Sequence, residues 1–369
     1  MRRRILAIFV LILVVFFSYF YFRLLAPLRE SPAFFWPIFG ILTTGLLALL
    51  WLPLFFWAST DTETKPYEIV IEKTAHLTMG LLSLLLFLSV TRDLLYGALL
   101  LAKHGEWVSG ERASLAIFAL ALALGIIGYL TARRGPVIRR IELNTDARAN
   151  HLRIVQISDL HVGSWIGKRY VERVVAGIEA LGPIDFLILT GDIGDGDPNK
   201  HVEDLAPIGR IPVRIGKFAV SGNHEGYWNE AEWNRRIRDL GFRVLENESL
   251  ELRTAHGPVS IHGISDAGAD PKRALATVRP EVFSLFLSHQ PKHAEAAIAA
   301  GVRLQLSGHT HAGQFLPWSL FIGFAHRFSA GLYRVGPTAI YVNSGTGFWG
   351  PPFRLGTRSE TTLIQFFPG

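Results

Sequence analysis

The stretch Arg153–His161 reads RIVQISDLH, and it indicates how the second half of the chain is built. Its first residues are rich in Ile and Val, as expected of a short buried β-strand. The strand-like run ends at Ser158, and a carboxylate and an imidazole follow at once as Asp159 and His161. Such a strand predicts an α/β fold whose functional site lies at the carboxyl ends of its strands.

Four further strand-like runs end in the same way. Phe186–Thr190, Phe218–Ser221, Leu285–Ser288 and Leu304–Ser307 are followed by GDIGD (191–195), GNHE (222–225), His289 and GHTH (308–311). Asp, His and Asn without thiolates suit Mn, Fe or Zn. In extended segments, residues two apart point the same way, which applies to Asp159 with His161 and to His309 with His311. A carboxylate such as Asp192, on a tight turn, can bridge two cations. The clusters together predict a divalent-metal site.

The rest of this half alternates between strand-like and helical patterns. Further strands are expected at Val137–Leu143, Val259–Ile264 and Ala339–Asn343, and helices at Arg169–Leu181, Glu230–Leu240 and Pro291–Ala300. This alternation predicts an α/β layer architecture. The chain has no cysteine, which excludes a disulfide framework, a thiolate metal site and a cysteine nucleophile.

The first half is different, because the apolar excess of the chain lies almost entirely before residue 132. Hydrophobic residues make up 49% of the chain and the mean hydropathy is +0.28. Four apolar stretches have about the length that spans a bilayer: Ile5–Phe22, Phe34–Trp57, Ala75–Val90 and Ala113–Leu130. We therefore expect a membrane region at 1–132, a basic linker with a first strand at 133–150, and an α/β domain with the metal site at 151–369.

Two of these stretches leave alternatives open. The first could be a signal peptide, but its long apolar run and bulky Tyr19–Phe22 favour an uncleaved span. The third meets Arg92-Asp93 and is apolar again from Leu94 to Ala102. Either the span stops at Arg92 and an interfacial helix follows, or one long helix buries an ion pair. The first is expected, since charge in hydrocarbon is costly.

The net charge of +6 arises largely from arginines beside the apolar stretches, a membrane-flank pattern, and no basic aromatic stripe indicates nucleic acid. Four spans place nine cations on one side: Arg2, Arg3, Arg4, Lys65, Lys73, Arg133, Arg134, Arg139 and Arg140. Five lie on the other: Arg23, Arg29, Arg92, Lys103 and Arg112. The excess predicts a multi-pass protein of the cell (inner) membrane with both termini and the soluble domain in the cytoplasm.

The five strand-end clusters resemble the calcineurin-like metallophosphoesterase superfamily, whose pattern is D-x-H, G-D-x-x-D, G-N-H-[DE], a lone His and G-H-x-H. The ending Tyr341–Pro352 with Gly356–Arg358 is similar to its membrane-associated YaeI/YkuE-like branch, and the multi-span start is similar to transmembrane proteins with a metallophosphoesterase domain. Two positions depart from that branch. Ala312 stands where it usually has Gly, and Ser344 where it often has Arg; both bear on substrate fit.

The resemblance implies a four-layer α/β/β/α sandwich after the all-α transmembrane helices. It implies two divalent ions, Mn, Fe or Zn with Mn favoured, and a metal-activated hydroxide. One ion would be held by Asp159, His161, Asp192 and His311, and the other by Asp192, Asn223, His289 and His309. His224 would stabilise the phosphoryl group or protonate the leaving oxygen, with a supporting hydrogen bond to a ligand as the alternative.

The expected function is that of a membrane-anchored phosphohydrolase, more specifically a phosphodiesterase, acting on a phosphoester. The apolar run Phe315–Phe324, read as a loop beside the site, either packs under the domain or contacts lipid, which makes a lipid-linked substrate a candidate. A lipid pyrophosphatase of the UDP-diacylglucosamine type and a non-catalytic membrane sensor are the alternatives. Asp195 and Asp197 either extend the site or are solvated turn residues, and His326 matches no motif. No protein partner is indicated.

Overall fold

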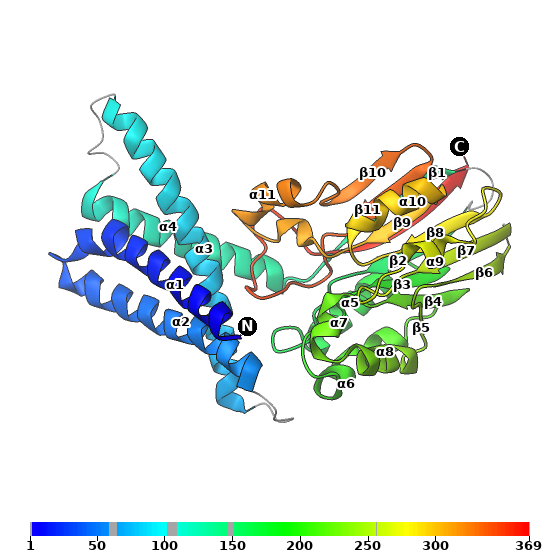
Figure 1. Cartoon of the computed structure of the whole chain (residues 1–369), viewed down its shortest axis with the longest axis horizontal. Coiled ribbons are helices and arrows are strands. Elements are labelled where there is room, and N and C mark those ends of the chain that lie inside the picture. The colour runs from blue at the N-terminus through cyan, green and yellow to red at the C-terminus, as the bar shows by residue number, and fades with distance from the viewer. Residues whose placement is uncertain (1, 59–64, 102–108, 146–150, 256, 369) are drawn as a thin grey trace. The chain divides into compact units, whose positions relative to one another are not determined.

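The computed structural model describes residues 2–58, 65–101, 109–145, 151–255 and 257–368 (Figure 1). The chain forms two compact units. The helical unit comprises Met1–Leu130 and Gly350–Leu355, and the α/β unit comprises Thr131–Trp349 and Gly356–Gly369. The short return of residues 350–355 to the helical unit was not expected from the sequence.

Among the residues that the structure describes, the helical unit contains four helices that are long and apolar enough to cross a membrane, as the four apolar stretches predicted. The first is α1 (Arg2–Phe20), which continues through a π-helical turn η1 (Tyr21–Leu25) and a 3₁₀ turn η2 (Ala26–Leu28). The other three are α2 (Pro32–Ala58), α3 (Pro66–Leu101) and α4 (Gly110–Arg133). Lys103, one of the cations used to predict orientation, lies outside the described residues.

The expectation that the third span stops at Arg92 is wrong. The α3 helix runs without a break for 36 residues through Arg92 and Asp93. The Asp93 carboxylate accepts hydrogen bonds from Arg92 (2.8 Å), from Arg23 on η1 (2.6 Å) and from the Tyr19 hydroxyl (2.9 Å). Because two guanidinium groups and a hydroxyl share this carboxylate, the helix does not have to end to expose the charges to water.

Glycines allow close packing inside the helical unit. A Cβ on Gly80 of α3 would lie 2.5 Å from the Phe353 ring, and one on Gly128 of α4 would lie 3.3 Å from Phe353 Cβ. The Arg354 amide also donates to the Gly128 carbonyl over 2.9 Å. The segment Gly350–Leu355 is therefore packed against α3 and α4, where a Cβ would clash at Gly80 and be crowded at Gly128.

The α/β unit contains two six-stranded mixed sheets. In spatial order, the first sheet consists of β1 (Val137–Thr145), β12 (Glu360–Pro368), β2 (Arg153–Ile157), β3 (Phe186–Thr190), β4 (Gly216–Val220) and β5 (Arg243–Val244). The second consists of β10 (Gly331–Val335), β11 (Thr338–Val342), β9 (Leu304–Ser307), β8 (Phe283–Leu287), β7 (Gly257–Gly263) and β6 (Glu248–Thr254). The neighbours β2, β3 and β4 are parallel, as are β7, β8 and β9.

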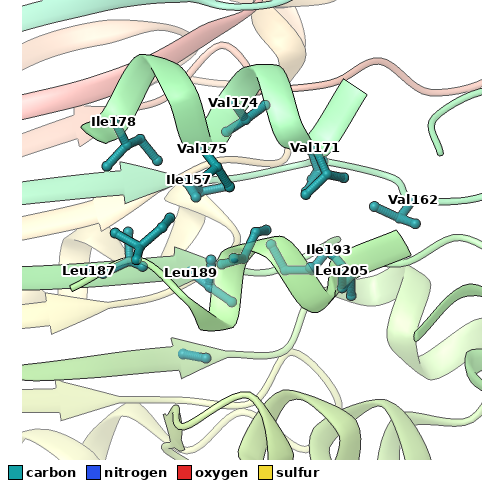
Figure 2. Close-up of a cluster of buried hydrophobic side chains, with 14 of the residues drawn as sticks. Ile157, Val162, Val171, Val174, Val175, Ile178, Leu187, Leu189, Ile193 and Leu205 are labelled. Carbon is teal, nitrogen blue, oxygen red and sulfur yellow. The ribbon is translucent and has the colours of Figure 1, made fainter. Parts of the chain in front are cut away.

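The buried side chains show that the sheets pack face to face with helices outside. Ile154 and Ile188 of the first sheet share one cluster with Ile261 and Leu285 of the second. Alternate residues of the same strands point the other way, because side chains on a strand alternate between its two faces. Figure 2 shows this outer face, where Ile157, Leu187 and Leu189 meet α5 (Lys168–Glu179).

Helices cover both outer faces. Val171, Val174 and Ile178 of α5 lie in the cluster of Figure 2, together with Leu205 of α6 (Pro198–Gly209). Trp233 of α8 (Glu230–Asp239) belongs to the same cluster. On the second sheet, Phe286 packs with α9 (Pro271–Leu275) and α10 (Ala294–Ala300), which follows the short η5 (Pro291–His293). The expected α/β/β/α sandwich is confirmed.

Most expected elements form within a few residues of their predicted bounds. The strands β5, β6, β10 and β12 and the helices α6, α7 (Asn223–Trp228) and α9 were not anticipated. The stretch Phe315–Phe324 was expected to be a loop, but most of it forms the helix α11 (Trp318–Ala325). Its residues are almost all apolar, and an apolar run without polar alternation is compatible with loop, strand or helix alike.

Candidate metal centre

The expected ligands come together at the carboxyl ends of β2, β3, β4, β8 and β9. Asp159, His161 and His311 form one group whose ligand atoms lie within 4.8 Å of one another. Asp192, His289 and His309 form a second group that meets the same limit. Strand-end clusters that are far apart in sequence, such as His161 and His311 with 150 residues between their positions, therefore converge at one place.

The Asp192 carboxylate lies between the two groups. Its Oδ2 atom is 3.9 Å from His161 Nε2 and 3.2 Å from His289 Nε2. Its Oδ1 atom accepts a hydrogen bond from the His224 amide over 2.8 Å. One oxygen of Asp192 is thus fixed by the backbone, and the other faces both groups.

Asn223 and His289 complete the second group. Asn223, the first residue of the short helix α7 (Asn223–Trp228), places its Oδ1 3.1 Å from His289 Nε2. His289 Nδ1 lies 2.8 Å from the Thr190 carbonyl, which accepts the proton of that nitrogen. Because Nδ1 donates to a carbonyl, loss of the other ring proton would leave the Nε2 lone pair directed into the site, as in histidines that bind metals.

Five of the seven expected ligands have a left-handed backbone. The φ angles are 51° at Asp159, His161 and Asp192, 72° at His309 and 50° at His311. The extended geometry that we expected for the Asp159–His161 and His309–His311 pairs is therefore wrong, although both pairs do converge. Asp and His tolerate positive φ better than most residues, yet each such position costs about 1–3 kcal/mol. The packing of the surrounding sheets must offset the energetic cost of these backbone conformations.

Two glycines make room for the convergence. A Cβ on Gly191, where φ is 86°, would lie 2.6 Å from His289 Nδ1 and 2.7 Å from the Gly222 amide. A Cβ on Gly308 would overlap Ser158 Oγ and the Asp159 carboxylate. Any larger residue at either position would push the ligands of different strands apart.

Glu225 fixes the loop after β3 to the loop after β4, a role that the sequence analysis did not assign. Its buried carboxylate accepts hydrogen bonds from the amides of Asp192 (2.9 Å), Ile193 (2.7 Å), Gly194 (3.1 Å) and Gly222 (2.6 Å). Four donors on one carboxylate hold Asp192 and Asn223 in a fixed relation. The acidic residue at the end of the GNHE sequence was the available signal.

Asp195 extends the site, while Asp197 does not. Asp195 lies 3.1 Å from His224 Nδ1 and 3.7 Å from His161 Nδ1, and it accepts a hydrogen bond from Trp228 Nε1 over 3.0 Å. His161 and His224 pack edge to face with ring centroids 4.6 Å apart. Asp197 instead caps α6 by accepting from the Asn199 amide. Asp195 thus orients two imidazoles, one from each neighbouring loop.

The electrostatics of the second group favour a cation. Burial acts to lower the pKa of His289, but the Asp192 carboxylate outweighs burial and raises it to about 10. Burial and the charge of His289 lower the pKa of His309 to about 3. These two rings lie edge to face with His309 Nδ1 3.2 Å from His289 Nε2, and only one of these two nitrogens can hold a proton between them. A shared cation would satisfy both lone pairs and the carboxylate.

The donor distances also fit divalent ions. His161 Nε2 and His311 Nε2 are 3.1 Å apart, and the His289–His309 pair is 3.2 Å apart. Two imidazole nitrogens bound to one ion at about 2.1 Å lie about 3.0–3.4 Å apart for angles between 90° and tetrahedral. Burial raises the pKa of the Asp159 carboxyl, which a nearby cation would reverse. The residues present therefore fit divalent metal ions.

Three aromatic rings lie next to histidines of this site. His224 packs against Tyr227 and Trp349, with ring centroids at 5.1 and 5.7 Å. On the other side, the His326 ring lies 5.7 Å from the His309 ring, so His326 is beside the site although it matches no motif. Tyr227 and Trp349 are 65% and 47% exposed and so remain available to a bound molecule.

The two departures from the family pattern have different surroundings. Ala312 adopts a left-handed backbone with φ 53° and ψ 30°, a conformation that favours the glycine usual at this position. Ser344 donates its amide to the Glu360 carboxylate over 3.0 Å. The backbone at Ala312 keeps the shape that glycine would give it, at some cost in strain.

The comparisons with known proteins agree with this geometry. The family model for calcineurin-like phosphoesterases matches residues 152–313. The transmembrane protein with metallophosphoesterase domain of Bos taurus is 32% identical over 276 residues, which cover 69% of this chain and 62% of that protein. An uncharacterized metallophosphoesterase of Helicobacter pylori is 31% identical, with 71% of this chain and 74% of that protein covered. The uncharacterized metallophosphoesterase YkuE of Bacillus subtilis is 32% identical, with 58% and 78% covered.

The extent of these similarities differs between relatives. The chain spans 62% of the length of the bovine and zebrafish transmembrane proteins. It spans more than two thirds of the bacterial relatives from Helicobacter pylori and Bacillus subtilis, each of which is more than 30% identical. With its apolar helices, two-sheet domain and convergent Asp, His and Asn side chains, the chain belongs to the calcineurin-like phosphoesterase family.

Proposed function

We propose that this chain is a membrane-anchored phosphodiesterase that uses a dinuclear metal centre. The observation that carries the proposal is the position of Asp192 Oδ2 between two groups of ligands, 3.9 Å from His161 Nε2 and 3.2 Å from His289 Nε2. Asp159, His161 and His311 with Asp192 would hold one ion. Asn223, His289 and His309 with Asp192 would hold the other. We favour Mn, since oxygen and imidazole donors without thiolate suit it.

Two bound divalent ions would supply positive charge for a phosphoryl oxygen and lower the pKa of a bound water. The protein's own contribution is positioning. Glu225 and the left-handed backbone at the ligands fix the donors before a substrate arrives, so that little reorganisation is needed during the reaction. Burial of Asp159 and Asp192 excludes bulk water from the inner side of the site.

His224 is suited to act as the general acid. Burial acts to lower its pKa, but Asp195, 3.1 Å from Nδ1, raises the pKa above the usual histidine value. The raised pKa favours the protonated imidazole, which is the form that can give a proton to the leaving oxygen. Asp195 is a positioning residue in this proposal, because it acts through His224 and His161.

The exposed rings around His224 support a substrate with a second, apolar ester group. Tyr227 and Trp349 are close enough to contact a group attached to the phosphorus beyond the metal site. We propose a phosphodiester with a lipid-linked group, presented at the membrane in which the apolar helices anchor the chain. A lipid pyrophosphate of the UDP-diacylglucosamine type is the second candidate, supported by the same apolar surroundings.

Hydrolysis of bis-p-nitrophenyl phosphate by the purified chain, with Mn²⁺ added, tests the proposal. Asp192→Asn and His224→Ala are expected to lower kcat by about 10²–10⁴-fold. His201→Ala is the control, since His201 pairs with Asp204 on α6 outside the site. Elemental analysis of the same samples is expected to find two metal ions per wild-type chain and fewer in Asp192→Asn.

Equal rates in wild type, Asp192→Asn and His224→Ala would overturn the catalytic proposal and leave a metal-binding sensor as the function. A parallel series with a monoester, a diester and a lipid pyrophosphate identifies the bond that is cleaved. Faster hydrolysis of the monoester than of the diester would contradict the phosphodiesterase assignment.

A further inference from the structure

The α11 helix exposes more apolar surface than a soluble domain normally does. None of its eight residues, WSLFIGFA, is buried. Trp318 is 50% exposed, Phe321 52% and Phe324 89%. Leu320, at 57%, adds to the same helix. A contiguous apolar surface of this kind marks an interaction site rather than ordinary surface composition.

The helix is held at both ends, so it projects as a fixed feature. Before it, the Gln314 side chain donates to the Trp349 carbonyl and accepts from the Trp349 amide, both over 2.9 Å. Thr357 Oγ1 also donates to the Gln314 carbonyl. After it, the Ser329 carbonyl accepts from Thr310 Oγ1 over 2.5 Å. Thr310 lies between the expected ligands His309 and His311. The contacts that hold α11 are therefore made by residues that adjoin the metal centre.

The helical unit of the same chain would keep the α/β unit close to a membrane. Four of its helices are long and apolar enough to cross a membrane. Gly356, where an added Cβ would lie 3.7 Å from both Leu316 and Ser319 at the start of α11, directly follows Leu355, the last residue of the segment that belongs to the helical unit. A Trp and two Phe on a short, almost wholly apolar helix, bordered by the Arg327–Glu295 ion pair, are the aromatic side chains that the membrane interface favours.

We propose that α11 dips into the lipid bilayer and so holds the metal site at the level of the lipid headgroups. The occupant of this surface is the acyl region just below the headgroups, contacted by Trp318, Leu320, Phe321 and Phe324. Phosphodiesters whose phosphate lies in the headgroup layer would then reach the site without leaving the membrane. This last step rests on the proposed function, whereas the contact with lipid does not.

Because the chain has no cysteine, a single introduced cysteine can be labelled specifically. Phe324→Cys and, as the matched control, Leu332→Cys on β10 of the same unit are each labelled with a polarity-sensitive fluorophore. Leu332 is a partly exposed apolar residue, at 37%, outside α11. The full-length proteins are reconstituted into phosphatidylcholine–phosphatidylglycerol vesicles with or without brominated acyl chains.

We expect blue-shifted emission at position 324 and at least threefold stronger quenching by brominated lipid than at position 332. Equal, weak quenching and water-like emission at both positions would overturn the inference. Blue-shifted emission at 324 without quenching would also overturn it, because the occupant would then be protein, either the chain's own helices or a second copy.

Hydrolysis of bis-p-nitrophenyl phosphate by the unlabelled wild type separates the two proposals. Hydrolysis without lipid quenching at 324 leaves the proposed function intact and removes the lipid contact. Lipid quenching without hydrolysis retains the contact and removes the phosphodiesterase.

Discussion

Ala312 is the residue at which the chain carries strain that a single substitution can remove. Its φ of 53° and ψ of 30° lie in the left-handed region, where a Cβ crowds the backbone. We expect Ala312→Gly to stabilise the α/β unit by about 1 kcal/mol. For a unit of this size, that gain raises Tm by roughly 2–4 °C. Thermal unfolding of the metal-free, full-length protein measures it.

The converse substitution makes the test two-sided. Ala312→Val puts a β-branched side chain at the same positive φ and is expected to lower Tm, since such residues are rarely found there. If Gly lowers Tm and Val leaves it unchanged, the left-handed geometry at Ala312 is not the one that the protein adopts in solution.

At the residue scale, the identity of the converging side chains could be predicted, but their backbone geometry could not. Asp159, Asp192 and His289 follow apolar strand-like runs, and strand ends of parallel sheets lie at one edge. Left-handed φ at Asp159 and Asp192 depends on tertiary contacts, such as the Glu225 carboxylate that accepts four amides across two loops. Asp195 was one of two candidates, and only the position of His224 distinguishes it from Asp197.

At the element scale, the continuity of α3 depends on charges that come from another helix. Residues 92–101 could be read as a separate helix because Arg92-Asp93 interrupts an apolar run. The structure shows that Arg23, 70 residues earlier, supplies the second guanidinium. No local pattern contains that information, whereas the apolar length of each span was sufficient to predict four helices. For the same reason β12, which pairs with β1 and β2, was harder to predict than β2 itself.

The shared carboxylate gives a prediction for the helical unit. Asp93→Asn leaves Arg23 and Arg92 facing each other without an anion, whereas Arg23→Gln leaves the Arg92–Asp93 pair intact. We therefore expect Asp93→Asn to be the more destabilising change. In a double-mutant cycle, the coupling free energy of unfolding between Arg23→Gln and Asp93→Asn is expected to be about 1–3 kcal/mol. Thermal unfolding in detergent of the two single variants and the double variant measures it.

Glu111→Gln is the matched control for this cycle. It makes the same change from carboxylate to amide in the same unit, and the Glu111 Oε1 atom accepts a hydrogen bond from Ser31 Oγ that an amide oxygen can also accept. If Asp93→Asn shifts Tm no more than Glu111→Gln does, Asp93 is not the link between η1 and α3.

At the scale of the whole molecule, the division into a helical and an α/β part was visible in composition, but the return of Gly350–Leu355 to the helical unit was not. Phe353 packs against Gly80 and Gly128, and glycines in apolar helices have no sequence pattern that identifies their partner. Orientation across the membrane likewise depends on the whole chain. Arg23 and Arg92, two of the five cations assigned to the far side, share the partly buried Asp93 carboxylate.

The orientation of the chain across the membrane can be tested by labelling single cysteines. Four spans place both ends of the chain on the same side of the membrane, and the larger number of Lys and Arg residues on that side predicts the cytoplasm. Glu30→Cys, between η2 and α2, is then expected to react with a membrane-impermeant maleimide in intact cells. Glu203→Cys on α6 is expected to react only after permeabilisation. Both residues are exposed glutamates in a chain without cysteine. A difference in labelling therefore reports the side of the membrane on which each residue lies. The reverse labelling pattern would place the metal site outside the cytoplasm, where a phosphodiester of the outer lipid leaflet would be the substrate to test first.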